Sequence, residues 1–516
     1  MMYLRGMTSA ETTLAPATPD AIRVAPEDHV AVALRDLAAG DEVIVGDQAV
    51  QLRDAVATGH KFALMPVEAG NPVYRYRAPI GLATRPIAMG EHVHTHNLRT
   101  ALSGEQDYRY AGPSAAPGGA PDTHHVFKGY AREDGSVGTR NELWILPTVG
   151  CVGRLGERLA AWGNQRIAQG LGKGNVDGVH AFNHPFGCSQ LGADLEGTAA
   201  VIASLALNPN AGAVLLLGLG CESNQLDALL ERIPADRRAR LRILRAQSES
   251  DEFAAGEALI EELLAVMQAD HRTEVPLSKL RLGVKCGGSD AMSGLTANPL
   301  IGLMADAVTQ EGGSAILTEI PEVFGAETLL MERAVDEQVF GKLCDVVNSF
   351  KRYFIDHGEP VSENPSPGNI AGGITTLEEK SLGAVQKGGL APVCDVIRYG
   401  ERLSVPGLTV LEGPGNDAVS TTALAAAGAT ITLFSTGRGT PLGSPVPTMK
   451  IASNHTLAAR KANWIDFDAA TSLELGMEGA AEALLYRIIA IASGEPACNE
   501  RNDERAIGIW KRGVTL

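Results

Sequence analysis

The stretch AGAVLLLGLGCESN, residues 211–224, decides the fold class of this chain. Its apolar run is short enough to be a strand, and it ends in a polar, glycine-rich tip. Short apolar runs followed by such turns and by helical stretches are typical of buried strands in a parallel sheet. The same layout recurs in RLGVKCGGSD (281–290), AILTEIPE (315–322) and TITLFSTGRGTPLG (430–443). The chain is therefore predicted to be a multidomain α/β protein.

The polar tips of these runs are expected to form the functional site, because parallel α/β sheets bind ligands outside the carboxyl ends of their strands. Thiols, carboxylates, amides and one arginine are concentrated there. A helix is expected after Asp251, where apolar residues from Ile260 to Met267 follow helical spacing. Further strands are expected at ELWILPTVG (142–150), VDGVHAFNH (176–184), VCDVI (393–397) and LTVLE (408–412).

Length and charge limit the possible classes of protein. At 516 residues, two to four domains are expected. The net charge of −17 argues against nucleic acid as a partner, because phosphate binding needs basic patches. The sequence has no run of about 18 apolar residues, so neither a membrane-spanning helix nor a membrane partner is expected. The first residues lack the apolar core of a signal peptide, and residues 1–24 are interpreted as a flexible tail.

The seven cysteines are far apart, their number is odd, and no CxxC occurs. This pattern argues against a disulfide framework and favours a cytoplasmic location. An isolated cysteine is most often a small buried hydrophobe, which fits Cys344 and Cys394. Cys188, Cys221 and Cys286 fit less well, since each lies in a glycine-rich tip.

Composition also indicates the domain boundaries. Short alternating runs at 28–98 predict a β-rich domain, and the Pro/Gly/Ala-rich stretch 99–127 predicts a linker. An α/β middle domain is expected at 128–272 and a second α/β domain at 278–516. In the β-rich part, EHVHTHN places His92, His94 and His96 on one strand face, which is either metal-binding or simply solvated.

Four residues are candidate metal ligands. Thiolate, imidazole and carboxylate groups at separate tips could together hold an iron-type metal, and three cysteines could equally hold an iron–sulfur cluster with one open iron. The alternative is that the glycines form tight turns and the thiols only pack. The candidate ligands are His184, Cys188, Cys221 and Cys286.

Other polar tips suit a polyhydroxylated acid. Arg438 is the strongest candidate for binding a carboxylate. Glu319, Glu322 and Asp290 are candidate catalytic acids, and either glutamate could instead bind metal. Each polar residue could alternatively serve only to form a turn. The remaining candidate substrate-binding residues are Asn364, Asn369, Asn416, Asp417, Lys450, His60 and Lys61.

Signatures of other enzyme classes are missing. LGLGCES (217–223) lacks the third glycine of the dinucleotide fingerprint, and the sequence has no Walker A motif and no nucleophile-elbow serine. Nicotinamide redox chemistry, phosphoryl transfer and serine-based hydrolysis therefore lack support.

Several long motifs in one order resemble the altronate/galactarate dehydratase family. The resemblance runs from about residue 28 to the C-terminus, and GHKFAL, EHVHTHN, CNERND and KRGVTL favour its altronate branch. Ile370 departs from the family, whose motif NPSPGNK has lysine there. The motifs are GYAREDGSVGTRNELWILPTVGCVG, FNHPFGCSQLG, GLGCESNQ, CGGSDAMSGLTANP, TEIPEVFGAE, NPSPGNIAGGITTLEEKSLGAVQKGG and FSTGRGTPLG.

The resemblance implies a hydro-lyase that removes water from D-altronate to give 2-dehydro-3-deoxy-D-gluconate in hexuronate (galacturonate) breakdown. It also implies dependence on Fe2+, with Mn2+ as a substitute, an N-terminal SAF (β-clip) domain, a middle domain that helps to form a homodimer, and a Rossmann-like C-terminal domain. The alternatives are a galactarate dehydratase, a sulfolactate sulfo-lyase of the same family, and a non-catalytic sugar-acid-binding protein.

Overall fold

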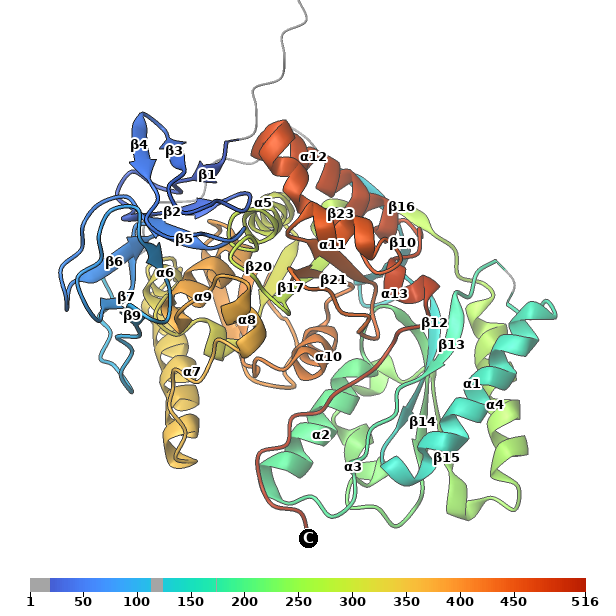
Figure 1. Cartoon of the computed structure of the whole chain (residues 1–516). Helices are drawn as coiled ribbons and strands as arrows, with labels where there is room; N and C mark the ends of the chain where they lie inside the picture. The colour runs from blue at the N-terminus through green and yellow to red at the C-terminus, as the bar shows by residue number, and fades with distance from the viewer. Residues whose placement is uncertain (1–18, 113–123, 173) are drawn as a thin grey trace, which may run out of the picture.

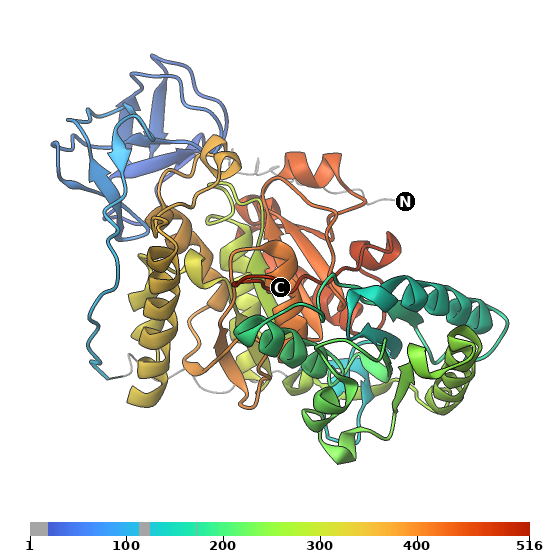
Figure 2. The ribbon, with the colours of Figure 1, turned by 90° about the horizontal axis from the view of Figure 1, so that it is seen from below.

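The computed structural model of the chain describes residues 19–112, 124–172 and 174–516. A β-rich N-terminal region and an α/β middle domain lie on opposite sides of a larger C-terminal domain (Figures 1 and 2). The N-terminal sheets are antiparallel, whereas the principal sheet of each later domain is parallel. The multidomain α/β prediction is therefore confirmed. Within the described part of the chain, no helix is long and apolar enough to cross a membrane.

The N-terminal region contains three small antiparallel sheets, with strand orders β1-β2-β5-β8, β3-β4 and β6-β7-β9. Burial alternates along β3, where every second side chain is exposed, as expected for a strand with one solvated face. The strands are β1 (Ala21–Ile22), β2 (Val30–Ala33), β3 (Glu42–Val45), β4 (Gln48–Gln51), β5 (Lys61–Ala63), β6 (Pro72–Arg75), β7 (Ala78–Ala83), β8 (His92–Val93) and β9 (Leu98–Arg99).

The middle domain is built on a four-stranded parallel sheet of order β13-β12-β14-β15. Helices α1 and α4 cover one face and α2 covers the other, so β14 is buried along almost its whole length. The elements are β12 (Glu142–Pro147), α1 (Gly153–Ala168), β13 (Gly178–Ala181), α2 (Gly192–Leu205), β14 (Ala211–Gly218), α3 (Leu226–Glu231), β15 (Leu241–Arg245) and α4 (Glu252–Met267).

Asp251 caps α4 by accepting hydrogen bonds from the backbone N–H groups of Phe253 and Ala254, which fixes the predicted start of this helix. A small antiparallel sheet of order β11-β10-β16 lies beside the parallel sheet. Its strands are β10 (Val126–Ala131), β11 (Val137–Gly138) and β16 (Thr273–Pro276).

The C-terminal domain contains a seven-stranded parallel sheet of order β19-β20-β18-β17-β21-β22-β23. Its strands are β17 (Arg281–Cys286), β18 (Ser314–Leu317), β19 (Val393–Ile397), β20 (Gly407–Leu411), β21 (Ile431–Thr436), β22 (Thr448–Ala452) and β23 (Phe467–Asp468). Its helices are α5 (Ala297–Gln310), α6 (Glu327–Met331), α7 (Glu337–Asp356), α8 (Pro367–Ala371), α9 (Leu377–Ala384), α10 (Asp417–Ala427), α11 (His455–Arg460), α12 (Ser472–Ala492) and α13 (Cys498–Arg501).

Three boundary predictions need correction. The tail expected at 1–24 ends earlier, because β1 pairs with β2; residues 1–18 lie outside the described residues. The boundary expected near 270–279 contains β16, which pairs with β10. The expected linker 99–127 is partly packed, since the Tyr108 hydroxyl donates to Glu327 at 2.6 Å; residues 113–123 of it lie outside the described residues.

A buried carboxylate joins the N-terminal region to the C-terminal domain. Glu379 on α9 lies 2.9 Å from Lys61 Nζ and 2.6 Å from Arg75 Nη1, and none of the three side chains is more than 1% exposed. Burial acts to raise the pKa of Glu379, but the two cations outweigh it and lower the pKa to about 2. The N-terminal region is thus held by an ion cluster that water does not reach.

We expect Glu379→Gln to destabilise the protein by about 3–5 kcal/mol, because it leaves two buried cations without their anion. The folded pKa of about 2 lies below the ordinary 4.5, so this group's stabilisation is complete above pH 4.5 and is lost as the pH falls toward 2. Denaturant unfolding at pH 7 and pH 3 measures both effects. Asp20 and Arg35 form an exposed ion pair, so Asp20→Asn should destabilise the protein far less than Glu379→Gln. Equal losses in the two variants would contradict the prediction.

Candidate functional site

A thiol and two carboxylates converge at the carboxyl edge of the C-terminal sheet. Cys286 ends β17, and Glu319 and Glu322 follow the adjacent parallel strand β18. One ligand atom from each lies within 4.8 Å of the others, and all three residues are buried. The Cys286 Sγ is 3.0 Å from Glu322 Oε2. The structure thus brings three of the predicted site residues together, at the edge where the sequence places them.

Three buried lysines compensate the charge of this group. Lys285 Nζ is 3.0 Å from Glu319 Oε1, and Lys380 Nζ is 2.8 Å from Glu322 Oε1. Lys387 Nζ donates to Cys286 Sγ at 2.7 Å. A buried charge is tolerated when it has an oppositely charged partner. The lysines therefore offset the desolvation cost of the buried carboxylates.

The surroundings shift the pKa values of the acids in opposite directions. Burial raises the pKa of Glu319. Burial has the same tendency at Glu322, but the ammonium groups of Lys380 and Lys387 overcome it and lower that pKa to about 2. Burial and the neighbouring Glu322 raise the pKa of the Cys286 thiol to about 12. Titratable neighbours whose pKa values diverge in this way are typical of acid–base sites.

Glu319 has a strained backbone. Its φ of 74° and ψ of 63° lie in the left-handed region, which costs a non-glycine residue about 1–3 kcal/mol. The conformation turns its carboxylate back over the end of β17, where Oε2 accepts a hydrogen bond from the Cys286 N–H at 3.1 Å. Strain of this kind is concentrated at functional sites.

The donor set of Cys286, Glu319 and Glu322 could hold a metal ion. One thiolate with two carboxylates combines soft and hard ligands and fits a divalent transition metal such as iron(II) better than magnesium or calcium, which prefer oxygen ligands alone. The thiol must lose its proton to bind, because the thiolate is the ligand.

A pocket of about 450 Å³ lies between the N-terminal region and the strand tips of the C-terminal sheet. Thr58 and Gly59 line it from one side, and Asp290, Arg438 and Arg460 line it from the other. Both arginines are exposed. The N-terminal region therefore contributes to the wall of a cavity that offers cationic groups to an anionic ligand.

Contacts connect this pocket to the buried group. Arg438 Nη1 donates to the Gly368 carbonyl at 3.1 Å. The next residue, Asn369, accepts a hydrogen bond from Lys380 Nζ at 3.2 Å, and Asn364 accepts another at 2.9 Å. Lys380 thus links Glu322 to the loop that borders the pocket.

Other predicted substrate-binding residues lie close by but have structural partners. Asp290 is half-buried in the wall of the pocket and accepts hydrogen bonds from Ser293 and Ser453. Asp417 pairs with Lys285, and Asn416 caps α10.

The structure places the remaining candidates away from the buried group. Lys450 Nζ donates to the Pro441 carbonyl at 3.1 Å, and Lys61 belongs to the Glu379 cluster. His60 Nδ1 lies 3.1 Å from His92 Nε2, and its Nε2 lies 3.5 Å from the Ala371 carbonyl oxygen, next to the pocket. The histidine rings gather at the boundary between the two regions.

The four predicted metal ligands do not form one set. Cys286 lies in the C-terminal sheet, whereas Cys188 and Cys221 are exposed on loops of the middle sheet. His184 also lies there, and its Nε2 lies 2.8 Å from the Pro147 carbonyl oxygen. A strand-tip motif does not reveal which sheet its strand joins, and the prediction combined tips of two sheets.

The three lysines were not predicted from the sequence. A signal for Lys285 was present, because a lysine inside the otherwise apolar strand RLGVKC is unusual and needs a buried partner. Lys380 and Lys387 gave no such signal, since charged residues in a helical stretch such as LEEKS are ordinarily solvated.

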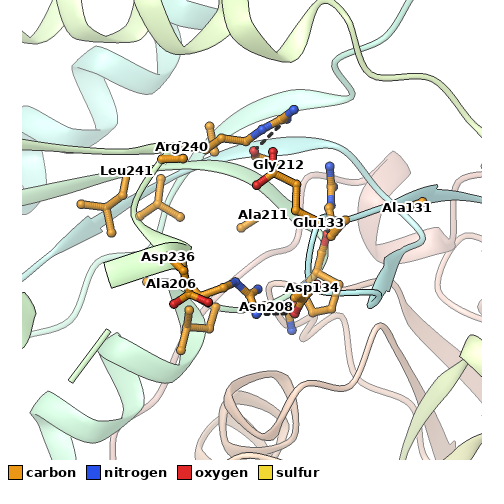
Figure 3. Close-up of a pocket in the computed structure, with 17 residues that line it drawn as sticks. Ala131, Glu133, Asp134, Ala206, Asn208, Ala211, Gly212, Asp236, Arg240 and Leu241 are labelled. Carbon is orange, nitrogen blue, oxygen red and sulfur yellow. Dashed lines mark hydrogen bonds and ion pairs between the residues drawn. The ribbon is translucent and has the colours of Figure 1, made fainter. Parts of the chain in front are cut away.

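A second pocket, of about 110 Å³, lies in the middle domain (Figure 3). Its lining holds three arginines and three acids, and its arginines are paired: Arg237 with Asp134 in the lining, and Arg240 with Asp270 outside it. This cavity therefore has no excess of positive charge, in contrast to the pocket lined by Arg438 and Arg460.

Comparison with known proteins assigns all three regions. Residues 19–101 match the altronate/galactarate dehydratase SAF domain, residues 129–268 match the D-galactarate dehydratase/altronate hydrolase second domain, and residues 277–515 match the D-galactarate/altronate dehydratase C-terminal domain.

Curated relatives match nearly the whole chain. An altronate dehydratase of Escherichia coli (strain K12) is 50% identical over 96% of this chain and 99% of its own length. An altronate dehydratase of Bacillus subtilis (strain 168) is 46% identical with the same coverage. A galactarate dehydratase (L-threo-forming) of Escherichia coli is 33% identical over 93% of this chain and 94% of its own length. The chain therefore belongs to the altronate/galactarate dehydratase family.

Proposed function

We propose that this protein is a hydro-lyase that converts D-altronate to 2-dehydro-3-deoxy-D-gluconate in hexuronate breakdown. The observation that carries the proposal is the level of identity, 50% and 46% with two altronate dehydratases against 33% with a galactarate dehydratase. The buried acid–lysine–thiol group beside an arginine-lined pocket supplies the groups that such an elimination needs.

The reaction needs three things from the protein. A base takes the proton from the carbon beside the carboxylate, an acid protonates the departing 3-hydroxyl so that it leaves as water, and positive charge stabilises the enediolate between these steps. The enol that results then tautomerises to the keto acid. The mass balance is the loss of one water molecule, with no oxidant or reductant.

We assign binding of the substrate carboxylate to Arg438, whose guanidinium lines the pocket and can bind two oxygens at once. Thr58 and Gly59 of the N-terminal region form the wall of the pocket opposite Arg438 and limit access of water to the enediolate. In this role the SAF domain is part of the active site.

Cys286, Glu319 and Glu322 would hold the iron(II) that the family resemblance implies, with manganese(II) as a substitute. When bound, the metal would supply Lewis-acid charge to the elimination. With the glutamates as ligands, we assign protonation of the departing 3-hydroxyl to Lys380, the most exposed of the three lysines. Its ammonium group donates to Glu322, Asn364 and Asn369, so it has protons to give and no free electron pair with which to act as a base. Metal analysis of anaerobically purified protein tests the ligand assignment: Cys286→Ser should lower the iron bound at this site.

We expect Lys380→Met and Lys380→Arg both to lower kcat about 10²–10⁴-fold, the usual contribution of a general acid or base. The arginine variant retains the charge but does not give up its proton near neutral pH, so it separates proton transfer from charge stabilisation. Lys342→Met removes a partly exposed lysine that pairs with Asp395 and is the matched control. A Lys380→Arg variant with nearly wild-type kcat would contradict the proton-transfer role.

Substrate choice is tested by assaying altronate, galactarate and (2R)-sulfolactate side by side with the same iron-loaded preparation. We expect kcat/KM to be highest for altronate. A higher kcat/KM for galactarate or sulfolactate would show that the protein has the activity of another branch of the family. Thermal stabilisation by altronate without formation of keto acid would instead indicate a binding protein.

We further propose that the protein is a cytoplasmic homodimer. Light scattering on the purified protein tests the oligomeric state, and a monomer at micromolar concentration would contradict it.

A further inference from the structure

Three exposed cysteines lie on neighbouring loops of the middle domain, away from the proposed active site. Cys151 follows β12, Cys188 follows β13, and Cys221 follows β14. These strands are adjacent and parallel, in the order β13-β12-β14, so their carboxyl ends meet at one edge of the sheet. Exposure of three thiols at one edge is unusual, because free cysteine is among the most buried residue types.

The three loops are joined directly by backbone hydrogen bonds. The Gly150 N–H donates to the Phe186 carbonyl at 2.9 Å, which joins the first loop to the second. The Asn224 N–H donates to the Gly187 carbonyl at 2.9 Å, which joins the third loop to the second. The Asn224 side-chain amide donates to the Thr148 carbonyl at 3.1 Å and completes the triangle.

A glycine makes the close approach of the first two loops possible. Gly187 has a φ of +96°, and a Cβ at this position would lie 2.0 Å from the Thr148 carbonyl oxygen. Any side chain would therefore separate the loop of Cys188 from the loop of Cys151.

Two buried polar side chains support the loops from below. His184, 5% exposed, has its Nε2 2.8 Å from the Pro147 carbonyl oxygen, and its Nδ1 accepts from the Phe186 N–H at 3.2 Å. Glu222, 3% exposed, accepts from the Thr148 hydroxyl at 2.7 Å and from the Gly220 N–H at 2.6 Å. Hydrogen bonds to the chain thus occupy both residues, and the two side chains hold the cysteine loops in place instead of acting as ligands.

The chemistry of the edge indicates which cofactor fits. Thiolates without carboxylate or imidazole select soft metal centres, namely zinc or iron–sulfur clusters. In a mononuclear tetrahedral site the ligand sulfurs lie roughly 4 Å apart, because each metal–sulfur bond is about 2.3 Å. The described residues contain no trio of these sulfurs within 4.8 Å. A cluster binds each thiolate to a different iron and therefore accepts the wider spacing.

We propose that Cys151, Cys188 and Cys221 bind a four-iron iron–sulfur cluster, with three irons held by thiolates and the fourth open at the surface. Each thiol releases its proton to solvent on binding. This set of ligands differs from the set predicted from the sequence. Cys151 replaces Cys286, and His184 is not a ligand but supports the cysteine loops. The proposal is independent of the altronate assignment and of the metal site at Cys286.

The test is anaerobic reconstitution of the full-length protein with ferrous iron and sulfide, followed by desalting and measurement of iron and acid-labile sulfide. We expect the wild type to retain about four sulfides per chain. Cys151→Ser, Cys188→Ser and Cys221→Ser should each retain less than about one-fifth of that amount. Cys286→Ser and Cys394→Ser are the matched controls and should retain the wild-type amount of sulfide, even where Cys286→Ser loses activity.

A second measurement uses the wild-type protein alone and therefore does not depend on whether the variants fold. Alkylation of reconstituted wild-type protein, read by mass spectrometry, should find Cys151, Cys188 and Cys221 protected relative to protein that was not reconstituted. Wild-type protein without bound sulfide, equal sulfide loss in Cys286→Ser, full sulfide in the three single variants, or unprotected thiols would each overturn the proposal.

Discussion

Compensation of buried charge is the constraint on which the structure of the C-terminal domain depends. Glu319 and Glu322 lie at the end of a buried strand, where an unpaired carboxylate would cost several kcal/mol. Lys285, Lys380 and Lys387 reach them from β17, from α9 and from the turn that follows α9. Each element is therefore fixed relative to the others by an ion pair as well as by apolar packing. The left-handed backbone at Glu319 is held by this arrangement, because its carboxylate is anchored on two sides.

The same constraint explains how a separate β-rich region becomes part of the candidate site. Glu379 precedes Lys380 on α9, so one helix carries an anion toward the N-terminal region and a cation toward Glu322. Docking of the N-terminal region supplies Lys61 and Arg75 to Glu379 and at the same time brings Thr58 and Gly59 over the pocket.

The sequence predicted secondary structure correctly where burial of a whole strand produces a continuous run of apolar residues. The continuous apolar runs predicted most strands of the two parallel sheets. Because parallel strands end at one edge, Cys286, Glu319 and Glu322 were expected at a common site. The strands β15, β22 and β23 were missed. Arg242 and Lys450 interrupt the apolar runs of the first two, and β23 has only two residues. Lys380 and Lys387 were missed because their burial depends on tertiary contacts. The predicted metal site that combined Cys188 and Cys221 with Cys286 was wrong for a related reason. A motif at the end of a strand does not indicate which sheet that strand belongs to.

The central claim is that the Lys380 ammonium group donates the proton with which the 3-hydroxyl leaves as water. The most direct measurement is the primary kinetic isotope effect on kcat with altronate deuterated at carbon 2, compared between the wild type and Lys380→Arg. We expect a lower kcat and a smaller isotope effect in the variant, because slow departure of the 3-hydroxyl, and not cleavage of that C–H bond, then limits the reaction. An isotope effect and a kcat equal to those of the wild type would contradict it.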